Sequence, residues 1–315
     1  MEDSVDEGSS IPSVPQHDES QLFRMALGAA HAVAWVWDIE ADVLAWFGDA
    51  KDLYGFDNDA TSGPSDTFLR AVHPDDQHTV VDALDATIRH GAEFEVEYRS
   101  VHDDGTVRWH RTKGTVVLGA GGRVTRMLGV ATDVTDRREV EERLAHLAVH
   151  DPLTDLPNRT LLLDRLGLAL DRQARQPGLL AVLFVDLDGF KGVNDRHGHE
   201  AGDQVLVTTA ARLRSAVRPA DTVARLGGDE FVVVAELSSR TEATGLAARL
   251  VTKVGEPHEL GGTTVVCPAS VGLQVAGPDS TPASLLRDAD AAMYRVKGTR
   301  TGTSRWVTDD RATET

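Results

Sequence analysis

The segment VARLGGDEFVVVAEL, residues 223–237, decides the fold of the second half of this chain. Two runs of mostly apolar residues flank a Gly-Gly pair, a pattern that predicts two strands joined by a tight turn. Asp229 and Glu230 follow the glycines directly. A hairpin turn requires glycines but has no use for two adjacent acids, so we expect these carboxylates to serve chemistry rather than the turn.

A second acidic segment lies upstream. GLLAVLFVDLDGF, residues 178–190, is apolar enough for a buried central strand and ends in Asp186 and Asp188, which as strand residues point the same way. Acids commonly end strands before a glycine turn, so this segment alone leaves a structural role open. If the hairpin pairs beside this strand, Asp229 and Glu230 come near Asp186, and crowded carboxylates raise one another's pKa. A hard divalent cation, Mg²⁺ or Mn²⁺, would resolve the repulsion and share substrate phosphates.

The region 151–308 alternates strands with helices, which predicts an α/β sandwich with a central sheet backed by helices. Asn158 is the expected N-cap of the first helix. The predicted helices lie at 158–176, 200–217, 240–254 and 282–298, and a strand pair is expected around 258–275.

The region 21–136 has a different order. Two strand-like runs come first, then a polar helical stretch that begins at Pro74 and stops at Gly91, then three alternating strands joined by the turns HDDGT and GAGGR. An antiparallel sheet with flanking helices is expected, so the fold class of the whole chain is α+β in two domains.

Residues 137–150 favour a linker helix with a narrow apolar seam at Val140, Leu144 and Leu147. Such a helix either lies against a domain of its own chain or forms a short parallel coiled coil with a second chain. Its position between two domains favours the coiled coil.

Bulk properties narrow the class of protein. A chain of 315 residues suits two domains, and a formal charge of −18 argues against binding to a nucleic-acid polymer. The single cysteine, Cys267, excludes an internal disulfide and favours a reducing, cytoplasmic location. No apolar run is long enough for membrane insertion, and we expect residues 1–20 to be a disordered acidic tail and 309–315 a short C-terminal tail.

The region 21–136 resembles a PAS sensor domain, from the W-x-W-D motif at residues 35–38 to GVATDVTDRR at 129–138. Members of that family bind haem, flavin, small metabolites or nothing. The photochemical flavin class needs a cysteine inside the domain, whereas Cys267 lies far downstream. Six histidines, among them His78 and His90, permit a haem ligand in principle, although solvated or core histidines are commoner. The PAS ligand therefore stays unknown at this point.

Three motifs of the second domain, HDPLTDLPNR at 150–159, FVDLDGFKGVNDRHGHEAGD at 184–203 and RLGGDEF at 225–231, resemble the GGDEF family of diguanylate cyclases. The resemblance implies a nucleotidyl-cyclase fold and an Mg²⁺- or Mn²⁺-dependent homodimer. It also implies a reaction in which two GTP molecules condense to cyclic di-GMP with release of two pyrophosphates.

Carried over by position, the resemblance makes Asp186, Asp229 and the Leu187 carbonyl metal ligands, with Glu230 assisting. Asp229 is also the candidate base for the ribose 3′-hydroxyl. Gly227 and Gly228 then let phosphate and ribose approach the backbone of the turn.

The same resemblance implies contacts to GTP. Asn194 and Asp203 would bind guanine, because a carboxylate accepts hydrogen bonds from groups that adenine lacks. Phe190, Lys191 and Lys297 would contact the phosphates. Arg300 stands one place earlier than the family's arginine, which leaves its phosphate role in doubt.

RPAD, residues 218–221 upstream of the hairpin, resembles the product-inhibition site of the same family. Arg218 and Asp221 would bind the phosphate and guanine of cyclic di-GMP, with Arg249 as a second arginine.

Two other readings stay open. One is a catalytically silent receptor for GTP or cyclic di-GMP, although such relatives usually lose one of the acids that this chain keeps. The other is a cyclase that makes a mixed dinucleotide, against which Asp203 counts. No phosphodiesterase module is expected after Val307.

Overall fold

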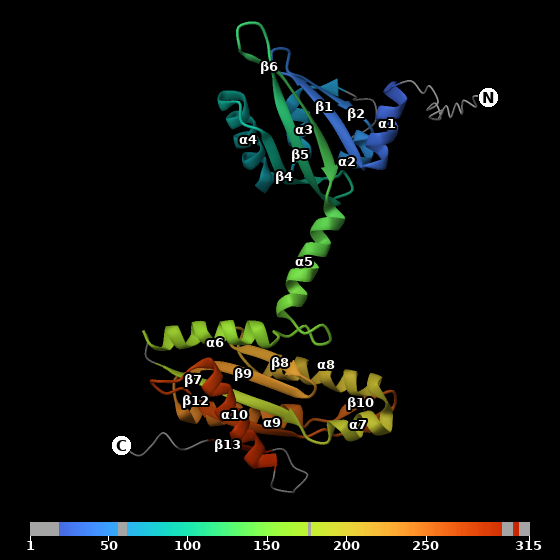
Figure 1. Ribbon diagram of the computed structural model, residues 1–315. Helices are drawn as coiled ribbons and strands as arrows, with labels where there is room; N and C mark the ends of the chain where they lie inside the picture. The colour runs from blue at the N-terminus through green and yellow to red at the C-terminus, as the bar shows by residue number, and fades with distance from the viewer. Residues whose placement is uncertain (1–18, 56–61, 176–177, 298–304, 309–315) are drawn as a thin grey trace, which may run out of the picture. The chain divides into compact units, whose positions relative to one another are not determined.

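The computed structural model describes residues 19–55, 62–175, 178–297 and 305–308. The chain divides into two compact units, Met1–Glu142 and Arg143–Thr315 (Figure 1). Within the described ranges, no helix is both long and apolar enough to cross a membrane.

The first unit contains a six-stranded sheet in which all neighbouring strands are antiparallel, in the order β3-β2-β1-β6-β5-β4. The three C-terminal strands are the long ones, as their alternating sequence predicts. The strands are β1 Ala32–Asp38, β2 Val43–Phe47, β3 Ser62–Gly63, β4 Phe94–Val101, β5 Val107–Leu118 and β6 Val124–Asp133.

Helices accompany this sheet and complete its core. They are α1 Glu19–Ala29, α2 Ala50–Tyr54, α3 Ser65–Ala71, a short 3₁₀ turn η1 at Pro74–Asp76 and α4 Gln77–His90. The predicted stop of α4 is confirmed, since Gly91 caps it with a φ of 65°. The helix α1, which begins within the expected tail, was not predicted. Residues 1–18 lie outside the described part of the chain.

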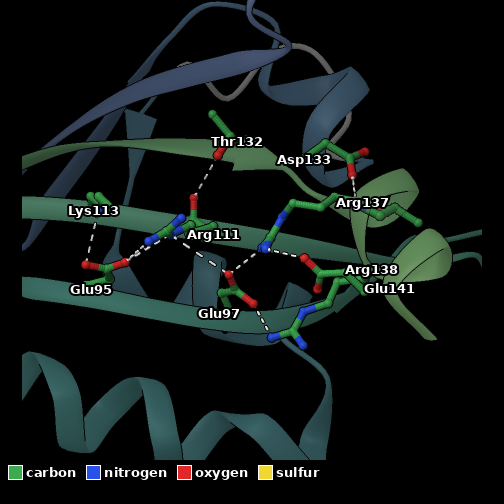
Figure 2. Close-up of polar contacts among 10 residues, drawn as sticks. Glu95, Glu97, Arg111, Lys113, Thr132, Asp133, Arg137, Arg138 and Glu141 are labelled. Carbon is green, nitrogen blue, oxygen red and sulfur yellow. Dashed lines mark hydrogen bonds and ion pairs between the residues drawn. The ribbon is translucent and has the colours of Figure 1, made fainter. Parts of the chain in front are cut away.

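The linker segment forms the helix α5, Thr135–Val149. Its first turn is held to the first unit by a network of charges (Figure 2). Glu97 on β4 accepts hydrogen bonds from Arg138 and, at 2.6 Å, from Arg137. The Arg138 guanidinium also lies 5.0 Å from the centre of the Trp109 ring on β5. Sheet and helix start are therefore joined by side chains as well as by the backbone.

The second unit is built on a five-stranded sheet, in the order β13-β12-β7-β9-β8. Only β12 and β13 are parallel. The strands are β7 Leu179–Leu187, β8 Thr222–Gly227, β9 Glu230–Leu237, β12 Ala269–Val275 and β13 Arg305–Thr308, and a separate pair is formed by β10 His258–Leu260 and β11 Thr263–Val265.

Helices cover both faces of this sheet, so the predicted sandwich is confirmed. On one face of the central strand β7, the side chains of Ala181, Leu183 and Val185 pack in a buried cluster with α8 (His199–Ala216) and α9 (Arg240–Val254). On its other face, Leu180, Val182 and Phe184 pack in a second cluster with α6 (Arg159–Gln173) and α10 (Pro282–Lys297). A strand buried on both faces is apolar at every position, which explains the continuous run in its sequence. The helices are α6 Arg159–Gln173, α7 Phe190–His197, α8 His199–Ala216, α9 Arg240–Val254 and α10 Pro282–Lys297.

The helices α6 and α7 differ in how clearly the sequence marks them. Asn158 is the N-cap of α6, as predicted, and accepts hydrogen bonds from the amides of Thr160 and Leu161. The short helix α7 was missed, because its eight residues provide only Phe190 and Val193 as buried apolar positions. This missed helix follows directly on the acidic end of β7.

Candidate active site

The turn between β8 and β9 is open on its outer side. Gly227 and Gly228 have φ values of 149° and 52°, in the region that favours glycine, and a Cβ added to either would meet nothing within 4 Å. The glycines therefore serve the backbone of the turn and also leave room for a ligand to approach it.

The predicted meeting of the two acidic segments is confirmed. β7 and β9 are antiparallel neighbours, with Asp186 opposite Glu230 in the register. The Leu187 amide donates to the Asp229 carbonyl at 3.4 Å, which brings the turn against the end of β7. Asp186, Asp229 and Glu230 thus lie together where β7 ends and β9 begins.

Burial and mutual repulsion act on these carboxylates. The pKa of Asp186 is raised, mainly by burial and further by the negative charge of Asp229, although a hydrogen bond from Lys297 opposes the rise. The pKa of Glu230 is raised by burial and by Asp186, Asp290 and Asp229. The site therefore holds more negative charge than it neutralises by itself.

Lys297, at the end of α10, is a cation that the described residues place at this site. Its Nζ lies 2.6 Å from Asp186 Oδ1, and the Asp186 side chain is 7% exposed. Burial lowers the Lys297 pKa, but the hydrogen bond to Asp186 and the charges of neighbouring carboxylates outweigh it, so the pKa is raised. Lys297 is thus charged and lies against the carboxylate of Asp186. Arg300 lies outside the described residues.

Asp188 begins the turn after β7 instead of continuing the strand. Its carboxylate accepts hydrogen bonds from Ser270 Oγ on β12, at 2.9 Å to each oxygen. Burial raises the pKa of Asp188, with the negative charge of Asp229 also contributing. The expectation that Asp186 and Asp188 point the same way as residues of one strand is therefore wrong for Asp188, which lies in the turn and is anchored to the neighbouring strand.

A largely buried ion pair that the sequence did not predict lies behind the turn. The Arg225 guanidinium donates to both carboxylate oxygens of Asp151, at 2.8 and 3.0 Å, and to the Gly228 carbonyl, at 2.7 and 3.0 Å. Asp151 also accepts from the amide and hydroxyl of Thr154. Arg225 therefore fixes the turn to the loop that precedes α6, although both residues stood in motifs already recognised.

The residues expected to bind guanine lie on the adjoining helices α7 and α8. A Cβ at Gly202 would fall 1.9 Å from Asn194 Oδ1, so this glycine allows the Asn194 side chain to lie against the start of α8. Asp203 is the next residue and is exposed. Phe190 is buried at the start of α7, whereas Lys191 beside it is exposed.

The residues of the expected inhibitory site lie near the opposite end of β8 from the Gly227–Gly228 turn. The Arg218 amide donates to Asp221 Oδ2 at 2.9 Å, and the Arg218 side chain forms an ion pair with Glu242 of α9. Arg249 donates to the Ala216 carbonyl at 2.8 Å. Glu242 was not foreseen, and it competes with any anion for Arg218.

The donors at the hairpin fit a hard cation. They are carboxylate and carbonyl oxygens, the ligands that Mg²⁺ and Mn²⁺ prefer. Within the described ranges, no group of three or more His, Cys, Asp or Glu side chains forms a ready metal cluster. A cation here would therefore complete its shell with main-chain oxygen, water or substrate phosphate, as Mg²⁺ commonly does.

Comparison with known proteins identifies both halves. Residues 148–303 match the family model described as "Diguanylate cyclase, GGDEF domain", and residues 43–131 match the model described as "PAS fold".

Individual relatives agree with the family models. The chain is 46% identical over 165 residues to diguanylate cyclase TpbB of Pseudomonas aeruginosa, which covers 51% of this chain and 38% of TpbB. It is 45% identical over 164 residues to the bifunctional diguanylate cyclase/cyclic di-GMP phosphodiesterase MucR of the same species, over 52% of this chain and 24% of MucR. The chain therefore matches well under half the length of these relatives.

Among solved structures, the coiled coil and GGDEF domain of DgcB from Caulobacter crescentus, in complex with c-di-GMP, is similar with a TM-score of 0.50. The identity is 29%, and the match covers 56% of this chain and 93% of that one.

Proposed function

The chain belongs to the GGDEF family through residues 148–303 and carries a PAS-fold domain before it, and from this premise we propose that it is a PAS-regulated diguanylate cyclase. In the proposed reaction, the 3′-hydroxyl of each of two GTP molecules attacks the α-phosphorus of the other. Two phosphodiester bonds form, two pyrophosphates leave, and the product is cyclic di-GMP. One observation carries the proposal: Asp186, Asp229 and Glu230 converge on an open glycine turn with a surplus of negative charge.

Asp186, Asp229 and the Leu187 carbonyl would hold a divalent cation, with Glu230 assisting. When bound, Mg²⁺ or Mn²⁺ supplies positive charge that neutralises the triphosphate and makes the attacking hydroxyl more acidic. Asp229 is proposed to take the 3′-hydroxyl proton, since it lies in the open turn. The positive charge of Lys297 supports its role as a ligand of the phosphates.

Selection of GTP is assigned to Asn194 and Asp203, because the Asn194 side chain lies against Gly202, the residue before Asp203. Adenine would leave the Asp203 carboxylate without a hydrogen-bond partner, so binding of ATP would be unfavourable relative to GTP. The backbone of Phe190 and the ammonium group of Lys191 would contact the phosphates of GTP.

Activity as a homodimer is proposed, because one domain holds one GTP and the reaction needs two. The apolar seam of α5 supports the pairing of two linker helices. Val140, Leu144 and Leu147 are 56%, 62% and 41% exposed, and no residue of α5 is buried. Uncovered apolar residues at heptad spacing suit a parallel coiled coil.

Regulation is proposed at two places. The charge network of Figure 2 connects the PAS sheet to the first turn of α5, so a change in the sheet would reach the linker helix. Product is proposed to bind Arg218, Asp221 and Arg249, away from the catalytic acids, and to inhibit by fixing an unproductive domain arrangement.

A silent receptor of GTP or cyclic di-GMP is the second candidate. Retention of Asp186, Asp229 and Glu230 favours the cyclase, because a receptor that only binds has no need for repelling acids. Synthesis of a mixed dinucleotide is a further alternative that the Asp203 carboxylate disfavours.

The test is to incubate the purified chain with GTP and Mg²⁺ and to identify products by mass spectrometry, with Asp229→Ala as the paired variant. We expect cyclic di-GMP from the wild type and at least a hundredfold less from the variant, which loses a metal ligand without emptying a core position. Tight GTP binding without product would favour the receptor. Addition of ATP to the same mixture would reveal a mixed dinucleotide.

A further inference from the structure

A short segment at the start of β12, residues 267–270, holds Asp188 at the acidic end of β7 by three groups. The Asp188 amide donates to the Pro268 carbonyl at 2.7 Å, and the Asp188 carbonyl accepts from the Cys267 thiol at 3.6 Å. The Asp188 carboxylate accepts from Ser270 Oγ, at 2.9 Å to each oxygen. Because Pro268 has no N–H to donate in return, the backbone pairing of β7 with β12 stops at this point.

The bond from the Asp188 amide also sets the direction of the Leu187 carbonyl, because both groups belong to one peptide unit. In a trans peptide, the C=O and the following N–H point in opposite directions. The N–H points to Pro268 on the β12 side of β7, so the Leu187 carbonyl points to the β9 side. The Leu187 amide points the same way and meets the Asp229 carbonyl at 3.4 Å. A contact on one side of β7 therefore aims a proposed cation ligand at the turn on the other side.

Ser270 is the member of this segment whose side chain reaches the acids. It is 3% exposed and stands opposite Asp186 in the register of β7 and β12, so both side chains lie on the same face of the sheet. Its hydroxyl donates to Asp188, whereas Asp186 accepts from Lys297 at 2.6 Å. The hydroxyl thus keeps the Asp188 carboxylate turned to β12 and separate from the carboxylate of Asp186.

The strand that carries Ser270 is itself closely packed. Gly272 lies on the same face two residues later, and a Cβ added there would fall 2.1 Å from the Ala289 carbonyl oxygen and 2.2 Å from the Met293 amide nitrogen of α10. The same helix ends in Lys297. β12 therefore fixes the place of Asp188 through Ser270 and supports Lys297 through α10. Packed elements of this kind hold the groups of a site more precisely than loops do.

We propose that Ser270 is a positioning residue of the cation site: it fixes Asp188, and through the Asp188 peptide it keeps the Leu187 carbonyl directed at the cation. Groups that orient a metal ligand without touching the metal contribute roughly 10–100-fold to metal affinity or activity. The inference rests on the proposed function for the identity of the cation and the nucleotide. Its test measures cation binding and the backbone instead of product, so its failure is distinguishable from failure of the cyclase proposal.

The first test measures Mn²⁺ affinity of the full chain by electron paramagnetic resonance, with 3′-deoxy-GTP present. This nucleotide lacks the attacking hydroxyl, so the complex cannot react. We expect Ser270→Ala to weaken Mn²⁺ binding by about tenfold or more. The matched control is Ser239→Ala, which removes the hydroxyl that caps α9 and accepts from the Glu242 amide at 3.2 Å. It should lower Tm but keep the Mn²⁺ affinity within about twofold of wild type.

A double-mutant cycle tests whether Ser270 acts through Asp188. In an Asp188→Ala background the hydroxyl has no carboxylate to hold, so Ser270→Ala should change the Mn²⁺ affinity by less than about twofold. An equal loss of affinity in both backgrounds would overturn the proposal. So would an unchanged affinity in Ser270→Ala, or a loss in Ser239→Ala as large as that in Ser270→Ala, because the effect would then follow stability alone.

A further measurement needs neither cation nor nucleotide. In protein labelled with ¹³C and ¹⁵N, Ser270→Ala should shift the resonance that joins the Asp188 amide to the Leu187 carbonyl. Exchange of the Asp188 amide hydrogen with solvent should become about tenfold faster, because the peptide is held less firmly. Ser239→Ala should leave both quantities near wild type. An Asp188 amide that exchanges at the wild-type rate in Ser270→Ala would show that the hydroxyl does not fix this peptide, and would refute the assignment.

Discussion

The ion pair between Asp151 and Arg225 allows a sharp prediction, because it holds the Gly227–Gly228 turn and neither residue is among those proposed to bind GTP or metal. The Arg225 and Asp151 side chains are 10% and 16% exposed, and Arg225 also holds the Gly228 carbonyl. Asp151→Asn keeps an acceptor for Thr154 but removes the negative charge opposite Arg225. Loss of a hydrogen bond between charged groups costs about 1.5–3 kcal/mol. For a domain of this size we expect Tm to fall by about 3–12 °C, at 2–4 °C for each kcal/mol.

Activity should change in a particular way. Once Arg225 is no longer balanced by Asp151, the turn loses its fixed position, so kcat should fall by about tenfold or more while KM for GTP changes little. The assays are calorimetric unfolding and steady-state production of cyclic di-GMP. A matched control is Asp155→Asn, an acid in the same loop whose side chain is 68% exposed and whose φ of 56° asparagine tolerates. Its ion pairs with His146 and Arg214 are exposed, so the variant should lower Tm less than Asp151→Asn does.

The pH dependence gives a further check on the same variant. Burial alone would raise the Asp151 pKa, but bonds from Thr154 and Arg225 outweigh it, so the pKa is held below its ordinary value of 3.8. A carboxyl group whose pKa is lower in the folded state than in the unfolded state stabilises the fold at pH values above the unfolded-state pKa. This stabilisation is lost as the pH falls through the folded-state pKa. The difference in Tm between wild type and Asp151→Asn should therefore shrink below about pH 4. A variant that melts with the wild type at pH 7 and keeps its kcat would refute the reasoning.

Three other predictions concern regulation, specificity and assembly. Arg218→Ala should relieve product inhibition while the initial rate stays near that of wild type. Glu242→Gln should free the Arg218 side chain and so lower the product concentration needed for inhibition by up to about fivefold. Progress curves measure both effects, and identical plateaus in wild type and both variants would contradict the assignment. Asp203→Ala should lower kcat/KM for GTP by about 10²-fold or more and narrow the preference over ATP, which competition assays with both nucleotides measure. Leu144→Glu should weaken pairing of α5, so that activity per chain falls on dilution at a higher protein concentration than in wild type; sedimentation of both proteins supplies the comparison, and equal dimer affinities would oppose the coiled coil.

Much of the fold could be predicted because its signals are local. The period of apolar residues predicted the long strands of both units, and end residues such as Asn158 and Gly91 marked where helices begin and stop. Elements without such signals were missed. The helix α7 is short, and α1 has its apolar residues Leu22, Phe23 and Met25 exposed, so neither shows a clear buried stripe.

The candidate site divides in the same way. That Asp186, Asp229 and Glu230 meet followed from two strand ends in the sequence and one assumption about pairing, which the register between β7 and β9 confirms. The roles assigned to these residues, to Asn194 and to Asp203 stay predictions until the variants are measured.

The sequence by itself determined the two kinds of domain, the order of their main elements and the residue types available for chemistry, because these depend on neighbours within a few positions. Only the tertiary structure decided which distant groups meet. Arg225 forms an ion pair with Asp151, which lies 74 positions earlier in the chain, and Arg218 forms one with Glu242. The Trp35 ring packs against Gly114 and Gly129, which lie on strands far along the chain. Such partners depend on strand register and helix packing, where a shift of one residue sends a side chain to the other face of the sheet.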